Sequence, residues 1–230
     1  MDIEFGKVDN RETENNKTIL NLQNIRAIIF DFDDTLYSNG DWSRYYDECL
    51  KYFEDYGYTD DGWKFYEMLK KKYPDIPNLG YKTCRYLKEI GGDVNFLYDR
   101  LNEHIYDITN PNLKFMDYSL LEKLSKKYSI YLISNSPENY IKHYAKLFGV
   151  DLNCFKMVLF NKHEGEDYSK GFYMEKCMKD AKTLPSETLM VGDDPYTDML
   201  PAKNLKLNTF LVDDVSETEK LIKLLLKLKR

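Results

Sequence analysis

Three short apolar runs in this chain are each followed at once by a cluster of chemically capable side chains. The clusters are residues 31–35 (Asp-Phe-Asp-Asp-Thr), 134–136 (Ser-Asn-Ser) and 192–194 (Gly-Asp-Asp). Carboxylates brought together repel one another unless a cation neutralises them, and a donor set made only of oxygen suits a hard ion such as Mg²⁺. A divalent ion also makes an acidic site compatible with an anionic phosphate group. These residue types therefore predict metal-assisted chemistry on phosphate.

The elements around the clusters indicate how they are positioned. Residues 27–30 form a continuous apolar run that suits a strand buried on both faces of a parallel sheet. From residue 118 onward, strands alternate with helices, which predicts a doubly wound parallel α/β sheet. The predicted strands are 27–30, 129–133, 157–160, 188–191 and 209–212, and the predicted helices are 119–127, 137–148, 170–181, 197–204 and 216–229. Because the carboxyl ends of parallel strands share one edge, the three clusters should converge there.

A helical pattern replaces the alternation between residues 37 and 111. Start and stop signals predict four helices, at 41–57, from 59 or 60 to 73, at 79–90 and at 93–108. The segment holds twelve of the 20 tyrosines and both tryptophans. We expect these rings to pack a small helical bundle, and the alternative is a ring that stacks on a nucleobase or a sugar. The chain thus divides into a polar extension (1–24), an α/β core (25–36 and 112–230) and a helical insert (37–111).

Taken in order, the motifs resemble those of the haloacid dehalogenase superfamily of hydrolases over about residues 25–214. The resemblance depends on Asp-x-Asp-x-Thr-Leu at residues 31–36 after a hydrophobic strand, combined with Gly-Asp-Asp-x-x-x-Asp at residues 192–198. Ser134-Asn135 and a downstream lysine fit the same order. The resemblance implies the Rossmann-like core of that superfamily. An insert directly after the first motif is similar to its helical caps, which close over the site.

The same resemblance implies roles for the acids. Asp31 is expected to attack phosphorus and form an aspartyl-phosphate, and Asp33 to protonate the leaving oxygen and then deprotonate water. Mg²⁺ is expected to be held by the Asp31 carboxylate, the Asp33 backbone carbonyl and Asp193. Asp198 or Asp194 would order the water ligands of the metal.

Polar residues from the other motifs are expected to contact the phosphate group. The resemblance implies that Ser134 donates a hydrogen bond to a phosphoryl oxygen, with Asn135 and Thr35 close by. The motif lysine is assigned to Lys170, which opens a predicted helix, although the family often has proline where this chain has glycine after it. Lys162 stays open as the alternative.

Arg85, with Tyr81 and Lys82, is the candidate in the insert for contacts to the substrate. The alternative for Arg85 is an ordinary surface charge.

We therefore expect a Mg²⁺-dependent phosphoric monoester hydrolase acting on a small phosphorylated metabolite. Dehalogenation is disfavoured, because the dehalogenases lack the acid at the Asp33 position. The alternatives within the superfamily are a nucleoside 5′-monophosphatase and a phosphomutase. Outside the superfamily, the alternatives are an inert scaffold and a phospho-acceptor module. In a phospho-acceptor module the acidic pair precedes the accepting aspartate by a strand and a helix, whereas here Asp31 and Asp33 follow the same strand. The complete set of acid, hydroxyl, lysine and metal ligands argues against the scaffold.

Composition indicates which binding partners and which cellular compartment to expect. A net charge of −6 and a pI near 5.3 argue against binding to nucleic acid. Four cysteines without metal-type spacing, and no recognisable signal peptide, predict a reducing, cytoplasmic setting. The apolar stretches are far shorter than the ~20 residues that span a bilayer, and we expect the basic amphipathic segment 220–230 to dock on the sheet rather than on a membrane. The sequence does not indicate an oligomeric state.

Overall fold

The computed structural model describes residues 22–38, 43–76, 79–105, 113–136, 138–160 and 170–228. Most of the predicted polar extension (1–24), as well as Lys162, lies outside the described residues. Within them, five parallel strands form the main sheet in the order β5-β4-β1-β6-β7. Their bounds are β1 (Ala27–Phe30), β4 (Ser129–Ser134), β5 (Met157–Phe160), β6 (Thr188–Gly192) and β7 (Asn208–Leu211). Each strand begins and ends within one residue of the sequence prediction.

Strand β1 is the centre of the sheet. It lies between β4 and β6, and Phe30 aligns with Leu132 on one side and with Val191 on the other. The chain moves outward from β1 through β4 to β5, and then crosses to β6 on the opposite side of β1. The strand order therefore reverses at β1, and ligands of open α/β sheets bind at the carboxyl end of such a switch point.

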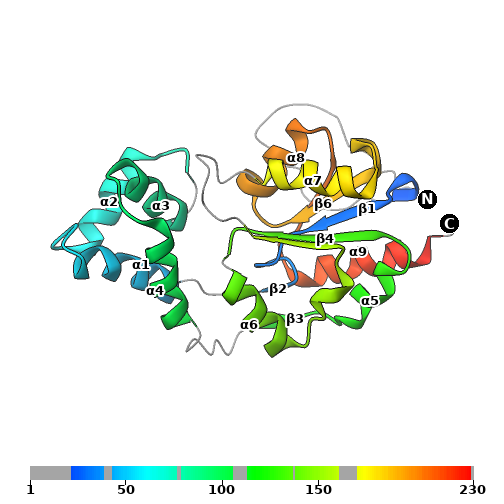
Figure 1. Cartoon of the computed structure of the whole chain (residues 1–230), viewed down its shortest axis with the longest axis horizontal. Coiled ribbons are helices and arrows are strands. Elements are labelled where there is room, and N and C mark those ends of the chain that lie inside the picture. Colours follow the sequence, from blue (N-terminus) through cyan, green and yellow to red (C-terminus); the bar gives the residue numbers. More distant parts are fainter. Residues whose placement is uncertain are drawn as a thin grey trace.

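Helices cover both faces of the sheet (Figure 1). Ala27 and Ile29 point to the face covered by α7 (Gly171–Ala181) and α8 (Leu200–Asn204), and Ile28 and Phe30 point to the face covered by α5 (Ser119–Ser125), α6 (Glu138–Phe148) and α9 (Val215–Lys227). This alternation explains why the run is apolar without a break. The predicted doubly wound fold is confirmed, and the apolar side of α9 is buried in the core as expected.

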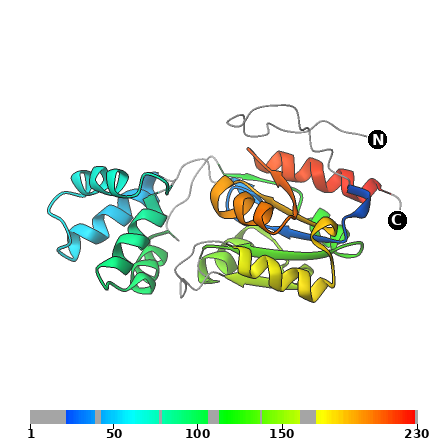
Figure 2. The ribbon, with the colours of Figure 1, turned by 90° about the horizontal axis from the view of Figure 1, so that it is seen from above.

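Four helices follow the first motif and stand at one end of the sheet (Figures 1 and 2). They are α1 (Ser43–Asp55), α2 (Gly62–Lys72), α3 (Leu79–Glu89) and α4 (Val94–Ile105). Aromatic rings fill their common interior, as expected, and the rings of Phe53 and Phe65 lie 4.5 Å apart with Tyr86 against both. The chain enters and leaves the insert beside a two-stranded antiparallel sheet of β2 (Tyr37–Ser38) and β3 (Lys114–Phe115), which the sequence analysis missed.

Short helical turns complete the described elements. Three are 3₁₀ turns, at Leu22–Asn24, Leu152–Cys154 and Pro185–Glu187. The helix predicted at 197–204 instead begins as a π-helical turn, Pro195–Met199, and continues as α8. Among the described residues, no helix combines the length and the apolar character needed to cross a membrane. None of the four cysteines, all of which lie among the described residues, forms a disulfide bond.

Candidate active site

The three polar clusters meet at the carboxyl edge of the sheet, as the sequence predicts. Asp31 follows β1, Ser134 ends β4 and Asp193 follows β6, so all three extend from neighbouring strands. The backbone N–H of Asp31 donates to the carbonyl of Val191 at 2.9 Å, which continues the β1–β6 pairing one residue past the strand. The position of this carboxylate is therefore fixed by the sheet itself.

Three acids converge at this edge. One carboxylate oxygen from each of Asp31, Asp193 and Asp198 lies within 4.8 Å of the others. Burial raises the pKa of Asp31 and that of Asp198 above their usual range, and it raises the pKa of Asp193 to about 8, with Asp198 adding to this effect. Carboxylates held this close favour a cation, and three oxygen donors fit the coordination preferences of Mg²⁺.

Lys170 supplies positive charge at the centre of this cluster. It stands at the N-terminal end of α7, it is buried, and its ammonium group donates to Asp31 and, at 2.6 Å, to Asp198. Burial acts to lower the pKa of Lys170, but the opposing effects of Asp198, Asp31 and Tyr81 together raise it above its usual value, so the ammonium stays charged. The sequence left Lys170 and Lys162 open as the motif lysine. Lys170 lies in the site, and Lys162 is outside the described residues.

Gly192 allows the last motif to fold tightly. A β-carbon at this position would lie 2.2 Å from a carboxylate oxygen of Asp198, which is closer than atoms can approach. Glycine is therefore required if Asp198 is to reach the cluster. Asp194, predicted as a metal-site residue, is placed differently: its Oδ1 accepts from the backbone N–H groups of Tyr196 and Thr197 at 2.7 and 3.1 Å. It caps the π-helical turn and is not one of the three converging acids.

The loop after β1 turns sharply so that Asp31 and Asp33 face the same site. Asp34 has a positive φ of 51°, a conformation that aspartate tolerates better than most residues, and the N–H of Leu36 closes the turn onto the carbonyl of Phe32 at 3.0 Å. Thr35, a predicted phosphate contact, is buried, and its hydroxyl lies 3.5 Å from Asp31 Oδ2.

Hydroxyl groups surround the Asp33 carboxylate. Its Oδ1 accepts from the Tyr37 hydroxyl at 2.6 Å, and its Oδ2 accepts from Ser136 at 2.5 Å and from Ser134 at 3.4 Å. Burial raises the pKa of Asp33, and the hydrogen bonds from Ser136 and Tyr37 oppose that rise. Ser134, the predicted donor to the phosphate group, thus lies beside Asp33. Neither Tyr37 nor Ser136 was among the predicted site residues, although Tyr37 directly follows the first motif and Ser136 belongs to the second cluster.

Asn135 connects the core to the insert. Its amide donates to the hydroxyl of Tyr81 on α3 at 2.9 Å, so Tyr81 is the insert candidate that reaches the motif residues. Lys82 is buried, and its ammonium donates to the backbone carbonyls of Tyr73 and Ile76 within the insert.

Arg85 is placed as an ordinary surface charge. It is exposed on α3, and its Nε donates to Glu89 at 3.1 Å one turn along the same helix. This contact fits the alternative of an ordinary surface charge, and the predicted contact between Arg85 and the substrate stays a prediction.

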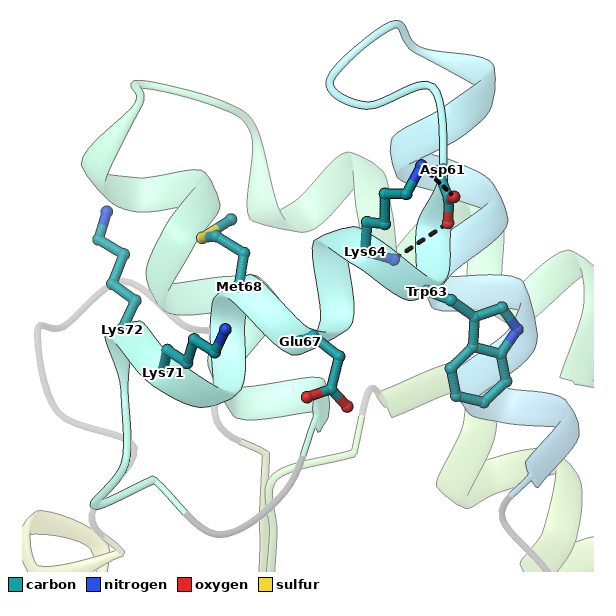
Figure 3. A pocket seen from close by; sticks show the side chains of 7 residues that line it. All are labelled: Asp61, Trp63, Lys64, Glu67, Met68, Lys71 and Lys72. Atoms are coloured by element: carbon teal, nitrogen blue, oxygen red, sulfur yellow. Dashed lines mark hydrogen bonds and ion pairs between the residues drawn. The ribbon is translucent and has the colours of Figure 1, made fainter.

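A surface hollow of about 840 Å³ lies elsewhere on the insert, along α2 (Figure 3). Its lining combines an exposed tryptophan with charged side chains and includes none of the predicted site residues: Asp61, Trp63, Lys64, Glu67, Met68, Lys71 and Lys72. Nothing in this set brings acid, nucleophile and metal ligands together. The carboxyl edge of the sheet is therefore the candidate active site.

Comparisons with known proteins agree with this arrangement. A family model described as haloacid dehalogenase-like hydrolase matches residues 28–212. The chain is similar to the crystal structure of a predicted phosphoglycolate phosphatase from Haemophilus somnus, with a TM-score of 0.57 and 15% identity over 87% of this chain and 98% of that chain. It is also similar to a putative β-phosphoglucomutase from Thermotoga maritima (TM-score 0.52, 16% identity, 89% of this chain and 100% of that chain).

A third solved structure is a putative hydrolase of the same family, YfnB from Bacillus subtilis bound to magnesium. It matches with a TM-score of 0.53 and 15% identity over 86% of this chain and 98% of that chain. At these identities the likeness shows the fold alone. No curated protein sequence matches the chain.

Proposed function

This chain belongs to the haloacid dehalogenase-like hydrolase family, and we propose that it is a Mg²⁺-dependent phosphatase that hydrolyses a small phosphorylated metabolite. The observation that supports this most directly is the presence of a second acid, Asp33, in the same turn as Asp31, with hydroxyl donors on both of its oxygens. An acid held here can exchange a proton with a leaving oxygen, which dehalogenation does not require.

The proposed reaction uses Asp31 and Asp33 in two steps. The Asp31 carboxylate attacks phosphorus, the bond from phosphorus to the ester oxygen breaks, and Asp33 gives its proton to the departing alcohol. Asp33 then takes a proton from water as the water attacks the aspartyl-phosphate. That step releases inorganic phosphate and restores the Asp31 carboxylate. Both steps therefore depend on the same position of Asp33.

Asp31, Asp193 and Asp198 are the residues that would hold Mg²⁺, which would offset negative charge on the phosphate group. Lys170 lies against two of these acids and would keep the Asp31 carboxylate oriented while it reacts. Ser134 and Asn135 lie on the Asp33 side, where they can donate to phosphoryl oxygens. We propose that the four-helix insert acts as a cap, and the Asn135–Tyr81 hydrogen bond supports this role.

The proposal is tested with a panel of phosphate monoesters, assayed with Mg²⁺ and with excess chelator. Wild-type protein should release phosphate only with the metal, and Asp31→Asn should lower kcat by at least about 1,000-fold, because a carboxamide cannot form the covalent intermediate. Asp213→Asn is the matched control, since Asp213 is an exposed acid after β7 at the same sheet edge. Near-normal turnover in Asp31→Asn, or no turnover of any ester by the wild type, would refute the proposal.

A further inference from the structure

Two buried phenols stand in line behind the Asp33 carboxylate. The Tyr37 hydroxyl donates to Asp33 Oδ1 at 2.6 Å, and the Tyr140 hydroxyl makes a short hydrogen bond to that of Tyr37. We propose that Tyr37, supported by Tyr140, is a positioning residue that holds the Asp33 carboxylate in the orientation used for both proton transfers. This inference rests on the proposed phosphatase function and assigns roles to two tyrosines outside the motifs.

The number of available protons determines which group donates in each of the two hydrogen bonds, Tyr140–Tyr37 and Tyr37–Asp33. A phenol has one proton to donate, and a carboxylate oxygen can only accept. While Asp33 is ionised, the Tyr37 proton is directed at its carboxylate, so in that state the bond between the two tyrosines is donated by Tyr140. The second hydroxyl therefore orients the first, and a bond to a charged carboxylate is stronger than one between neutral groups.

Packing holds the Tyr37 ring rigidly. It is 1% exposed, it stacks on Tyr144 with centroids 5.8 Å apart and planes 6° apart, and Phe32 and Phe148 lie 5.2 and 5.1 Å away. Its backbone lies in β2, where it aligns with Phe115 of β3. A hydroxyl on such a ring has little freedom, so it can fix the acid it contacts.

The two oxygens of Asp33 have different surroundings. Oδ1 faces Tyr37 and the aromatic core, and Oδ2 faces Ser136 and Ser134 at the end of β4, where the phosphate group is expected. Anchoring Oδ1 from the core side keeps Oδ2 directed toward the reacting oxygens. The serines alone do not achieve this, because a serine hydroxyl rotates about its side-chain bond and can also turn toward a ligand.

The test compares two phosphate esters whose leaving groups depend to different extents on protonation by Asp33. An alkyl phosphate has a poor leaving group that must be protonated, and 2,4-dinitrophenyl phosphate has a leaving group that departs as an anion. Tyr37→Phe keeps the ring and removes the hydroxyl. It should lower kcat/KM for the alkyl ester by roughly 10- to 100-fold, which is within what general acid catalysis supplies, and change that for the aryl ester by less than about threefold.

A second readout follows the second step. Because Asp33 must also deprotonate water, Tyr37→Phe should slow breakdown of the aspartyl-phosphate and produce a burst of dinitrophenolate that approaches one equivalent of enzyme. Tyr140→Phe should show the same selectivity with a smaller loss, and it provides a second test if Tyr37→Phe does not fold. Tyr131→Phe is the matched control, because the buried Tyr131 hydroxyl also donates to a carboxylate, that of Asp180 at 2.8 Å, away from the site.

The outcomes separate this inference from the function on which it rests. Asp33→Asn should show the same preference for the aryl ester in a stronger form. If Asp33→Asn behaves in this way and both tyrosine variants retain wild-type rates, or lose activity equally on the two esters, the positioning role is wrong and the phosphatase proposal stands. The alkyl ester is one that the wild type hydrolyses in the panel of phosphate monoesters. If the wild type hydrolyses no ester of that panel, the phosphatase proposal is overturned and this inference with it.

Discussion

Replacing Asp193 by asparagine should make the metal-free protein more stable, even though it removes a proposed metal ligand. The pKa of Asp193 rises from 3.8 to about 8 in the folded protein, mainly through burial and then through Asp198. An acid with a raised folded-state pKa destabilises the fold at any pH above its unfolded value. The free energy of unfolding therefore falls as pH rises from about 4 to about 8 and then levels off.

The size of the effect follows from the shift. Each pKa unit corresponds to about 1.4 kcal/mol, so a shift of about four units would lower the free energy of unfolding by roughly 5 to 6 kcal/mol above pH 8. The Asp193 side chain is partly exposed, and solvent screens part of this charge. We therefore expect Asp193→Asn to gain about 2 to 4 kcal/mol near pH 8 in the absence of divalent ions. The gain should vanish below about pH 3, where the acid is neutral in both states.

Urea denaturation in excess chelator, at several values between about pH 5 and pH 8.5, measures this difference directly. The same experiment with saturating Mg²⁺ should reverse the order, because a ligand that binds only the native state stabilises the wild type more than a variant that lacks one donor. The reasoning is refuted if the variant is less stable at every pH in chelator. It is also refuted if Mg²⁺ raises the midpoint of both proteins equally. Neither readout depends on catalysis.

Two further predictions concern the insert and the last helix. Tyr81→Phe removes the hydrogen bond to Asn135 and should lower kcat/KM for the preferred metabolite by roughly 3- to 10-fold, as expected for one neutral hydrogen bond; an unchanged substrate ranking across the ester panel would contradict the cap role. Asp214→Ala should cost about 1 to 2 kcal/mol in urea denaturation, because Asp214 caps α9 at Ser216 and pairs with Lys114. Lys114 and the Ser216 N–H lower the pKa of Asp214 to about 2, so its contribution is complete above about pH 4 and should fade as pH drops toward 2; a loss that does not depend on pH would exclude the ion pair.

The core strands could be predicted because a continuous apolar run leaves few other interpretations. Residues 27–30 and 157–160 match the observed β1 and β5 residue for residue. The two-residue strands β2 and β3 could not be predicted in this way, since two residues carry no periodicity and their pairing joins segments on either side of the insert. The π-helical turn at Pro195–Met199 was likewise hidden, because start signals do not distinguish α-helical from π-helical turns.

The convergence of the acids was also predictable, since parallel topology alone brings strand ends to one edge. The division of roles among them was not. Asp194 stands directly before a proline at a helix start, a capping signal that could have separated it from Asp193 and Asp198. The network around Asp33 needed the fold, because Ser136 and Tyr140 come from a strand end and a helix about a hundred positions further along the chain.

Two contacts connect the insert with the candidate site. The chain leaves the catalytic loop through Tyr37 in β2, whose hydroxyl contacts Asp33, and α3 of the insert returns to the site through Tyr81 and Asn135. The proposed general acid, Asp33, and the proposed phosphate contact, Asn135, therefore each make a hydrogen bond to a residue of the insert. A substrate that displaced the hydrogen bond between Asn135 and Tyr81 would alter the second contact, whereas the first is anchored in the aromatic core. We therefore expect substitutions of Tyr81 to change which leaving group is preferred. Substitutions of Tyr37 should instead weaken acid catalysis for every substrate whose leaving group needs a proton.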